Sequence, residues 1–416
     1  MNLLKQCKDR ALIYDGSKGV MLQLKGLSGG DSAEEWNLTH PEKVKEVYED
    51  YIAAGADVIQ TNTFCANAPS LRNHGLEDKL YELNYEGARL ALSCTAGTNV
   101  AVAASIGPTG LFFQPAGDMV FDSMVEVFKQ QLKPIKDAGV SLINFETFTD
   151  LNEMRAAMVA AQEIGGLAVI SSMTFDGGRT MSGNTPAACA VTCAALGAMF
   201  VGANCSGGPE SLLEPIGEMA GAVNIPLSVK PNAGLPEMES GVAVFKQKPE
   251  DFARLAPDFI KRGVRLIGGC CGSGPDHIKA LRAAVMETEV SEQPRGAGEM
   301  LASAYEAIPV AGLRTTEMKV CTDSIVAGMQ GGDYYCLMDA IPADAGDADA
   351  VILDFGSLEP FFDLWSFTST LGMFLKKPIV VKAENTEVAE GFLRCYAGRA
   401  GLAVSGLAEA YGAIKL

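Results

Sequence analysis

The feature that most constrains the fold is a regular alternation of short apolar runs with helix-length segments, from the start of the chain to about residue 286. Eight of the runs are typical of buried strands, and several of the segments between them open with proline or follow Thr, Asp or Ser, as helices do. Eight strands, each followed by a helix, are what a (β/α)8 TIM barrel requires. An open doubly wound sheet fits almost as well but usually needs fewer strands, so the barrel is favoured. The expected strands are Ala11–Tyr14, Asp57–Gln60, Val100–Ser105, Leu142–Phe145, Ala168–Met173, Met199–Ala203, Leu227–Lys230 and Arg265–Ile267.

The rest of the chain predicts a second, smaller α/β domain. Residues 287–312 have the polar, Pro- and Gly-containing character of a linker. We therefore expect a barrel domain over residues 1–286, a linker over 287–312 and a small α/β domain over 313–416. Three strand–helix units are too few to close a barrel, so this part is expected to dock on the first domain, to pair with another chain or to form a small layered domain. The expected elements are strands at Ala350–Phe355, Pro378–Ala383 and Gly401–Val404 and helices at Glu359–Phe374 and Thr386–Tyr396. Expected helices of the first domain include Pro41–Ala54, Ser123–Ala138, Leu151–Ile164, Pro186–Leu196, Pro249–Arg262 and Pro275–Val285.

Composition narrows the class of protein. The 416 residues carry a net charge of −18, which argues against partners such as nucleic acid or an anionic membrane surface. No apolar run approaches the roughly 20 residues of a membrane span, and the N-terminus lacks a signal-peptide pattern. We therefore expect a cytoplasmic enzyme. The 11 cysteines, an odd number in a chain of this size, argue against a disulfide framework and leave buried thiols and metal ligands as their roles.

Three cysteines fall where a barrel does its chemistry, at the carboxyl ends of its strands. Cys205 follows the sixth expected strand, and Cys270 and Cys271 follow the eighth within Gly-Gly-Cys-Cys-Gly. Three converging thiolates are typical of a zinc site with an open fourth position. The alternative is that these residues, like the chain's other cysteines, are small buried apolar side chains. The three histidines are not at strand ends, which argues against a histidine-based metal centre.

The ligand set predicts a type of reaction. Zinc with three thiolates carries a net charge of −1 and activates water poorly, but a thiol bound there loses its proton and stays nucleophilic. Asp15 and Glu146 follow the first and fourth strands and suit a substrate ammonium, while glycine-rich turns, such as the one at Gly16, offer N–H groups to a carboxylate. A small amino acid that bears a thiol fits all three features. As alternatives, each carboxylate could cap a helix or form a structural ion pair.

These motifs together resemble a known family. Residues 12–286 are similar to the homocysteine S-methyltransferase family, and most closely to the homocysteine-binding module of cobalamin-dependent methionine synthase. The motifs that carry the resemblance are Asp15-Gly16 with Gly19-Val20-Met21-Leu22-Gln23, Gly55-Ala56-Asp57, Thr61-Asn62-Thr63-Phe64, Gly107-Pro108-Thr109, Gly178-Arg179-Thr180-Met181-Ser182-Gly183, Asn204-Cys205, Gly208-Pro209, Pro231-Asn232-Ala233-Gly234-Leu235-Pro236 and Gly268-Gly269-Cys270-Cys271-Gly272.

The resemblance implies a zinc-dependent transfer of a methyl group to homocysteine, which gives methionine. Cys205, Cys270 and Cys271 match the zinc ligands of the family. Asp15 and Glu146 match the residues that hold the amino acid, Glu146 through its ammonium. No catalytic residue is expected beyond the zinc-activated thiolate of the substrate. We add Asn232, whose neutral oxygen would fill the fourth zinc position until the substrate arrives.

Two departures from the family pattern stand out. In the first motif, Lys18 and Val20 replace the usual Met and Thr, which affects the substrate contacts of the first turn. In the C-terminal part, Pro378–Lys382, Asn385–Gly391 and Gly398–Gly401 resemble part of a pterin-binding barrel, but Lys382 stands where an acidic residue is usual. A complete folate site is therefore not expected. Docking or oligomerisation is the favoured role of this part, and a small-ligand site is the alternative.

The methyl donor is left open by the sequence. The Asp-X-His-X-X-Gly signature of a cobalamin module does not occur, so we expect a methylcorrinoid such as methylcobalamin to be carried by a separate protein. The alternatives are a small donor such as S-methylmethionine or a betaine, a different acceptor thiol, and a non-catalytic scaffold subunit for a corrinoid partner. A homo-oligomer is also compatible with the sequence.

Overall fold

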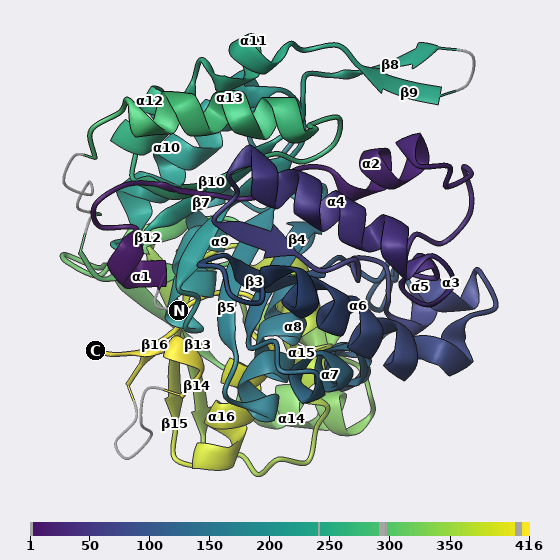
Figure 1. Ribbon diagram of the computed structural model, residues 1–416. Coiled ribbons are helices and arrows are strands. Elements are labelled where there is room, and N and C mark those ends of the chain that lie inside the picture. The colour runs from purple at the N-terminus through teal and green to yellow at the C-terminus, as the bar shows by residue number, and fades with distance from the viewer. Residues whose placement is uncertain (1–2, 240–241, 291–295, 297, 404–409) are drawn as a thin grey trace.

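The computed structural model describes residues 3–239, 242–290, 296, 298–403 and 410–416, and its largest unit is an eight-stranded parallel sheet rolled into a barrel (Figure 1). The strand order is β1-β10-β7-β6-β5-β4-β3-β2. A parallel bridge between Tyr14 and Val58 joins β1 to β2 and closes the sheet. The expected TIM barrel is confirmed. Its strands are β1 (Leu12–Ile13), β2 (Val58–Gln60), β3 (Ala101–Ile106), β4 (Leu142–Phe148), β5 (Ala168–Met173), β6 (Phe200–Cys205), β7 (Leu227–Pro231) and β10 (Val264–Ile267).

The helices around the barrel begin with the signals read from the sequence. The side chain of Asp150 accepts a hydrogen bond from Asn152 N at the start of α8, and Thr185 accepts one from Ala188 N at the start of α9. No helix in the described part of the chain is long and apolar enough to cross a membrane. The helices that precede residue 287 are α1 (Leu3–Gln6), α2 (Lys18–Leu24), α3 (Trp36–Thr39), α4 (Pro41–Ala54), α5 (Ala68–Arg72), α6 (Leu80–Thr95), α7 (Phe121–Asp137), α8 (Leu151–Ile164), α9 (Pro186–Ala195), α10 (Leu213–Ala222), α11 (Pro249–Ala253), α12 (Ala256–Lys261) and α13 (Pro275–Met286), with 3-10 turns η1 (Glu77–Lys79) and η2 (Pro209–Leu212).

The inside of the barrel changes from apolar to polar along the strands. Leu12, Val58, Ala103 and other apolar side chains form one buried cluster inside the barrel. Because side chains alternate between the two faces of a strand, the residue two positions on points to the same interior. At that level the strands carry buried polar side chains, which are Gln60, Ser105, Glu146 and Lys230. The polar layer lies toward the carboxyl ends of the strands, where the sequence predicts the site.

Two features between β7 and β10 differ from expectation. An antiparallel hairpin of β8 (Pro236–Glu239) and β9 (Val242–Phe245) follows β7 and extends from the body of the barrel (Figure 1). The single helix expected over 249–262 is two helices, α11 and α12. Pro257 explains the break, because proline lacks the N–H that a continuous helix would need there.

The C-terminal residues form a second parallel sheet of five strands, ordered β13-β14-β15-β16-β17, with its own apolar core. The strands are β13 (Thr315–Lys319), β14 (Ala350–Gly356), β15 (Ile379–Ala383), β16 (Gly401–Leu402) and β17 (Ile414–Lys415). Its helices are α14 (Asp323–Gln330), α15 (Leu364–Phe374) and α16 (Thr386–Cys395), with 3-10 turns η3 (Tyr335–Ala340) and η4 (Ala410–Gly412). The small α/β unit is thus confirmed, with β13 and β17 in addition to the three expected strands. Val404, the expected end of the third strand, lies outside the described residues.

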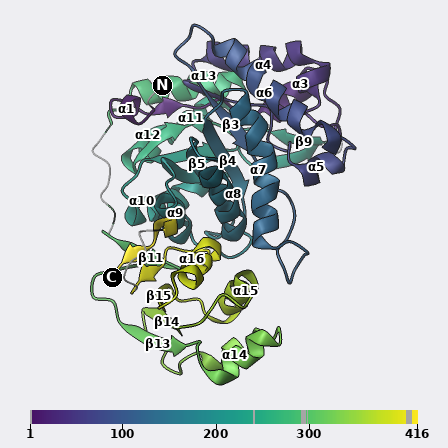
Figure 2. The ribbon, with the colours of Figure 1, turned by 90° about the horizontal axis from the view of Figure 1, so that it is seen from below.

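The second sheet lies beside the barrel helices α8 and α9 (Figure 2). Trp365 of α15 packs on Phe113 of the barrel, with ring centroids 4.7 Å apart. An antiparallel pair, β11 (Met300–Ala302) and β12 (Ala307–Pro309), lies within the segment expected as a linker, most of whose residues 291–297 fall outside the described residues. Ala302 N donates to Arg399 O, so this pair also touches the second sheet.

Candidate metal and thiol site

The barrel brings the three predicted cysteines together. Cys205 ends β6, and Cys270 and Cys271 follow β10; β6 and β10 both pair with β7, so their ends lie close in space. The three Sγ atoms lie within 4.8 Å of one another, and each residue is partly buried. In the described part of the chain, this is the one group of His, Cys, Asp or Glu side chains with a spacing suited to a metal ion.

The electrostatics of the cluster fit a cation. Hydrogen bonds from the thiols of Cys270 and Cys271 lower the pKa of Cys205 to about 3. The same contact with Cys205 raises the pKa values of Cys270 and Cys271, because one thiolate can accept the protons of its neighbours but three adjacent thiolates repel one another. A divalent cation removes that repulsion. Three soft sulfur donors with no histidine nearby are a donor set that zinc accepts.

Glycines let the loop after β10 close on the cluster. A Cβ on Gly268 would lie 2.3 Å from the Cβ of Tyr14, and one on Gly269 would lie 2.0 Å from Ser273 Oγ. A larger residue at Gly268 would force the loop away from the end of β1, and one at Gly269 would collide with Ser273 of the same loop. The Gly-Gly-Cys-Cys-Gly motif therefore sets how closely Cys270 and Cys271 approach the barrel axis.

Two asparagine amides surround the sulfurs. Asn232 Nδ2 lies 3.7 Å from Cys205 Sγ, and its Oδ1 accepts a hydrogen bond from Cys271 N at 3.0 Å. Asn204 Nδ2 lies 3.8 Å from Cys270 Sγ and donates to Thr147 Oγ1 at 2.8 Å. Both amides thus direct N–H groups at sulfur, which favours the thiolate form. The role of Asn232 as an oxygen ligand stays a prediction, since its oxygen is engaged with the N–H of Cys271.

Asp15 lies fully buried beside the first turn. Its Oδ2 accepts from Gln60 N at 2.7 Å and lies 3.4 Å from Lys18 Nζ, while its Oδ1 has no hydrogen-bond partner among the described residues. Burial raises the pKa of Asp15, although both Lys18 and Lys230 oppose the rise. A buried oxygen without a partner is costly, so it marks a place where a ligand donor would be stabilising.

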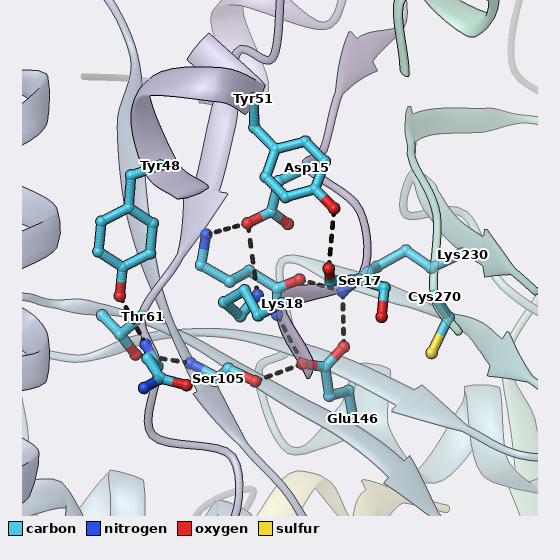
Figure 3. Close-up of polar contacts among 12 residues, drawn as sticks. Asp15, Ser17, Lys18, Tyr48, Tyr51, Thr61, Ser105, Glu146, Lys230 and Cys270 are labelled. Atoms are coloured by element: carbon cyan, nitrogen blue, oxygen red, sulfur yellow. Dashed lines mark hydrogen bonds and ion pairs between the residues drawn. The ribbon is translucent and has the colours of Figure 1, made fainter. Parts of the chain in front are cut away.

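Gly16, the other predicted residue of this turn, has a packing role that is visible in the structure. A Cβ there would lie 2.5 Å from Ser273 O and 2.9 Å from Tyr51 Oη. Tyr51 Oη in turn lies 2.9 Å from Ser17 O (Figure 3). It also lies 3.0 Å from Ser273 O. The turn after β1 and the cysteine loop after β10 are thereby held together. Binding of a substrate by Gly16 stays a prediction.

Glu146 of β4 lies at the centre of a buried polar network (Figure 3). Its Oε1 accepts from Gln60 Nε2 at 2.7 Å and from Ser105 Oγ at 2.5 Å. Its Oε2 pairs with Lys230 Nζ at 2.7 Å. Burial disfavours the charge on Lys230, but Glu146, Asp15 and Cys270 more than offset this effect and raise the pKa of the lysine. Lys230 was not singled out from the sequence.

Two other residues of interest take structural roles. His277 lies at the start of α13, where its Nδ1 accepts from Gly274 N and its Nε2 lies 2.9 Å from Gln247 O. Lys382, noted in the C-terminal part, pairs with Asp354 at 2.8 Å and with Glu317 at 3.3 Å. These two ion pairs of Lys382 link the three adjacent strands β13, β14 and β15 of the small sheet.

Comparison with known proteins places this geometry in context. Residues 12–285 match a family model described as homocysteine S-methyltransferase. Methionine synthase of Mycobacterium leprae is 28% identical over 436 residues, and that of Mycobacterium tuberculosis is 27% identical over 431. Both matches cover 96% of this chain but 36% of the relative, so the chain spans about a third of the length of these proteins. Among solved structures, the metallated form of the homocysteine methyltransferase MmuM from Escherichia coli shares the fold, with a TM-score of 0.59 and 24% identity over 68% of this chain and 99% of that one.

Proposed function

The chain belongs to the homocysteine S-methyltransferase family, and from this premise we propose that it transfers a methyl group to the thiol of homocysteine, giving methionine, with a zinc ion held by Cys205, Cys270 and Cys271. The observation that carries the proposal is the convergence of the three Sγ atoms within 4.8 Å at the carboxyl ends of β6 and β10. Bound zinc would supply a lowered pKa for the acceptor thiol while leaving its sulfur nucleophilic.

The chain's own residues would hold and orient the acceptor. Asn204 and Asn232 direct amide N–H groups at the cysteine sulfurs and so fix the ligand geometry. The unpartnered Oδ1 of Asp15 is available to a hydrogen-bond donor of the acceptor. The buried carboxylates of Asp15 and Glu146, which we call the carboxylate layer, lie on the same side of the barrel. The acceptor sulfur would attack the methyl carbon in line, so that a sulfur–carbon bond forms as the bond from that carbon to the donor breaks and the donor leaves with its electron pair. The contribution of the protein is position and a deprotonated thiol.

For the donor, we propose a methylcorrinoid carried outside these 416 residues. The similarity to methionine synthases over nearly the whole chain supports this choice. Assays with methylcobalamin, S-methylmethionine and glycine betaine, each with L-homocysteine and the zinc-loaded chain, would separate the donors. If methionine forms only from S-methylmethionine or glycine betaine, the proposed donor is that small molecule and not a methylcorrinoid.

The decisive test of the site is zinc-edge X-ray absorption on the full chain before and after addition of L-homocysteine. We expect three sulfur neighbours at about 2.3 Å, and a fourth after homocysteine is added. Zinc that gains no sulfur from homocysteine would point to another acceptor thiol. A carefully prepared protein that binds no zinc would favour the scaffold role instead.

Substitution of the ligands gives the matching prediction. Each of Cys205→Ser, Cys270→Ser and Cys271→Ser should lose both zinc and methyl transfer, because two thiolates no longer complete the donor set. Cys94→Ser is the matched control, since Cys94 lies on α6 outside the cluster. Zinc content is measured by metal analysis after gel filtration. Full activity in any of the three ligand variants would refute the assignment.

A further inference from the structure

Within the carboxylate layer, Glu146 is already paired with a cation of the chain itself, the ammonium of Lys230. Lys230 Nζ lies 2.7 Å from Glu146 Oε2, and the two side chains are 4% and 6% exposed. Gln60 bridges the pair, because its Oε1 accepts from Lys230 and its Nε2 donates to Glu146. With Ser105 Oγ also donating to Oε1, both oxygens of Glu146 are engaged by residues of the chain itself.

The position of Lys230 is fixed by its surroundings. It extends from β7 into the barrel interior, and its Nζ lies 5.0 Å from the centroid of the Tyr14 ring, a favourable place for a cation. A buried lysine without a carboxylate would be strongly disfavoured, so the pair with Glu146 is mutually required. The ammonium of Lys230 is therefore a permanent part of the layer.

The charges in the layer balance before any ligand enters. Asp15 faces Lys18 at 3.4 Å, and Glu146 faces Lys230 at 2.7 Å. An isolated buried carboxylate would demand a cation from the substrate, but neither carboxylate here is isolated. The Lys18 side chain is 12% exposed and its contact is the longer of the two, so Lys18 is the cation of the layer that an incoming anionic group can reach.

We propose that Lys230 is a specificity-determining residue whose ammonium takes the place on Glu146 that the α-ammonium of an amino acid would otherwise take. The protein then recognises the acceptor by its thiol and its anionic group rather than by its amino group. The substrate class is widened to thiol carboxylates that lack an amino group, alongside homocysteine. This inference rests on the proposed methyl transfer to a zinc-bound thiol and refines its acceptor.

The test compares L-homocysteine with 4-mercaptobutyrate, which is the same molecule without the amino group. Binding of each thiol to the zinc-loaded full chain is measured by calorimetry, and zinc-edge absorption reports whether its sulfur joins the metal. We expect both sulfurs to bind, with Kd values within about tenfold, because no charged hydrogen bond to Glu146 is lost. If homocysteine binds and 4-mercaptobutyrate binds more than about a hundredfold more weakly, the inference fails while the proposed function stands. If neither sulfur joins the zinc, the proposed function itself fails.

The variant Lys230→Met isolates the role of the lysine. It keeps a long side chain but removes the cation, so Glu146 becomes free to select an ammonium. The preference for homocysteine over 4-mercaptobutyrate should rise at least about tenfold. Lys133→Met, which removes an exposed pair with Asp137 away from the barrel interior, is the control and should leave that ratio unchanged. An unchanged ratio in folded Lys230→Met would overturn the inference.

The double variant Lys230→Met/Glu146→Gln covers the case in which the single variant does not fold. It removes both buried charges, which avoids leaving one unpaired. The ratio of the two Kd values should then stay near that of the wild-type chain, since no free carboxylate remains at this position. A strong preference for homocysteine in the double variant would show that the amino group is recognised elsewhere, and would overturn the inference.

Discussion

At the scale of single residues, the site depends on backbone conformations that residues other than glycine usually avoid. Cys205, Ser206 and Thr147 have φ values of 62°, 64° and 66°, in the left-handed region. Such conformations cost about 1–3 kcal/mol each and persist where neighbouring contacts hold them. The side chain of Asn204 supplies such contacts, since it bonds both N and Oγ1 of Thr147. Strain and sulfur ligation are therefore linked through one amide.

The amide of Asn232, which faces Cys205 Sγ, leads to a prediction about zinc affinity. Asn232→Ala should lower zinc affinity about 10- to 100-fold, because residues that orient metal ligands typically contribute that much. The variant loses the N–H directed at Cys205 Sγ and the acceptor of Cys271 N. Competition with a chromogenic chelator measures the affinity. Asn152→Ala, which removes an amide bonded to Asp150, is the control, and an affinity within twofold of wild type in Asn232→Ala would contradict the prediction.

The same scale shows what sequence reasoning can find at a site. The cysteines and the carboxylates Asp15 and Glu146 were identifiable because they follow predicted strands, and the structure places them at the same end of the barrel. Lys230 was missed because it lies within a strand that otherwise looks like ordinary core. Whether such a residue points into the barrel depends on strand register, which a single sequence does not display. Asn204 was quoted as part of a motif, but nothing in the sequence links its amide to Thr147.

At the scale of elements, burial decides which strands can be read from the sequence. The barrel strands were predicted within three residues at either end, because their runs are buried and apolar. The edge strand β13 was missed, since Met318 is its one fully buried side chain and polar residues alternate around it. The two-residue strand β17 and the hairpin β8–β9 were also missed, because segments so short or so far from the core carry little apolar periodicity.

Helix α8 carries a prediction about pH. Glu153 lies in its first turn, and its Oε1 accepts from both N and Oγ1 of Thr109 at 2.7 Å, which ties the loop after β3 to the helix. Burial raises the pKa of Glu153 from its ordinary value of 4.5 to about 7. Between these two values the folded chain binds one proton more than the unfolded chain. The contribution of Glu153 to the free energy of unfolding therefore falls as the pH rises through this window.

The variant Glu153→Gln measures this contribution, because a neutral amide keeps an oxygen that can accept from Thr109. Wild-type stability should decline relative to the variant by about 3 kcal/mol between pH 4.5 and 7.5. Urea unfolding at a series of pH values gives the difference. Glu163→Gln, at the other end of α8 and paired with Lys129 and Arg394 at the surface, is the matched control. A difference between wild type and Glu153→Gln that does not vary with pH would contradict the prediction.

At the scale of the whole molecule, the barrel and the five-stranded sheet each have a main apolar cluster, and the cluster of the barrel also takes in Trp365, Cys395 and Ala397 of the C-terminal part. We propose that the two units are domains joined within residues 287–312. Several side chains cross between them, among them Trp365, Arg394 and Arg155. Arg155 of α8 is fully buried and donates to the carbonyl oxygens of Leu393, Arg394 and Gly398. The carbonyls of the last turn of a helix lack partners within it, so Arg155 satisfies those at the end of α16. Burial lowers the pKa of Arg155 to about 10, which leaves it charged at neutral pH.

This arrangement predicts that Arg155 holds the second domain in place. Arg155→Met should reduce the free energy of unfolding by about 3 kcal/mol, because buried carbonyls are left without donors. The chain has two tryptophans, and Trp365 packs at the junction against Phe113. In a Trp36→Phe background, the fluorescence of Trp365 therefore reports the opening of the junction between the barrel and the second domain. Arg89→Met, which removes a surface pair with Glu86, is the control, and a loss no larger than that of the control would contradict the role of Arg155.

The same variant separates the two domains in function. The proposed cysteine ligands lie on β6 and after β10, whereas Arg155 lies on α8 and bonds the last turn of α16 and the segment that follows it. Zinc affinity of Arg155→Met, measured without denaturant, should therefore stay within about threefold of wild type, since contributions from sites without shared partners are additive. If the affinity instead falls together with the stability of the junction, the second domain takes part in forming the metal site. Its docking on α8 would then be a requirement for thiol activation rather than a separate contribution to stability.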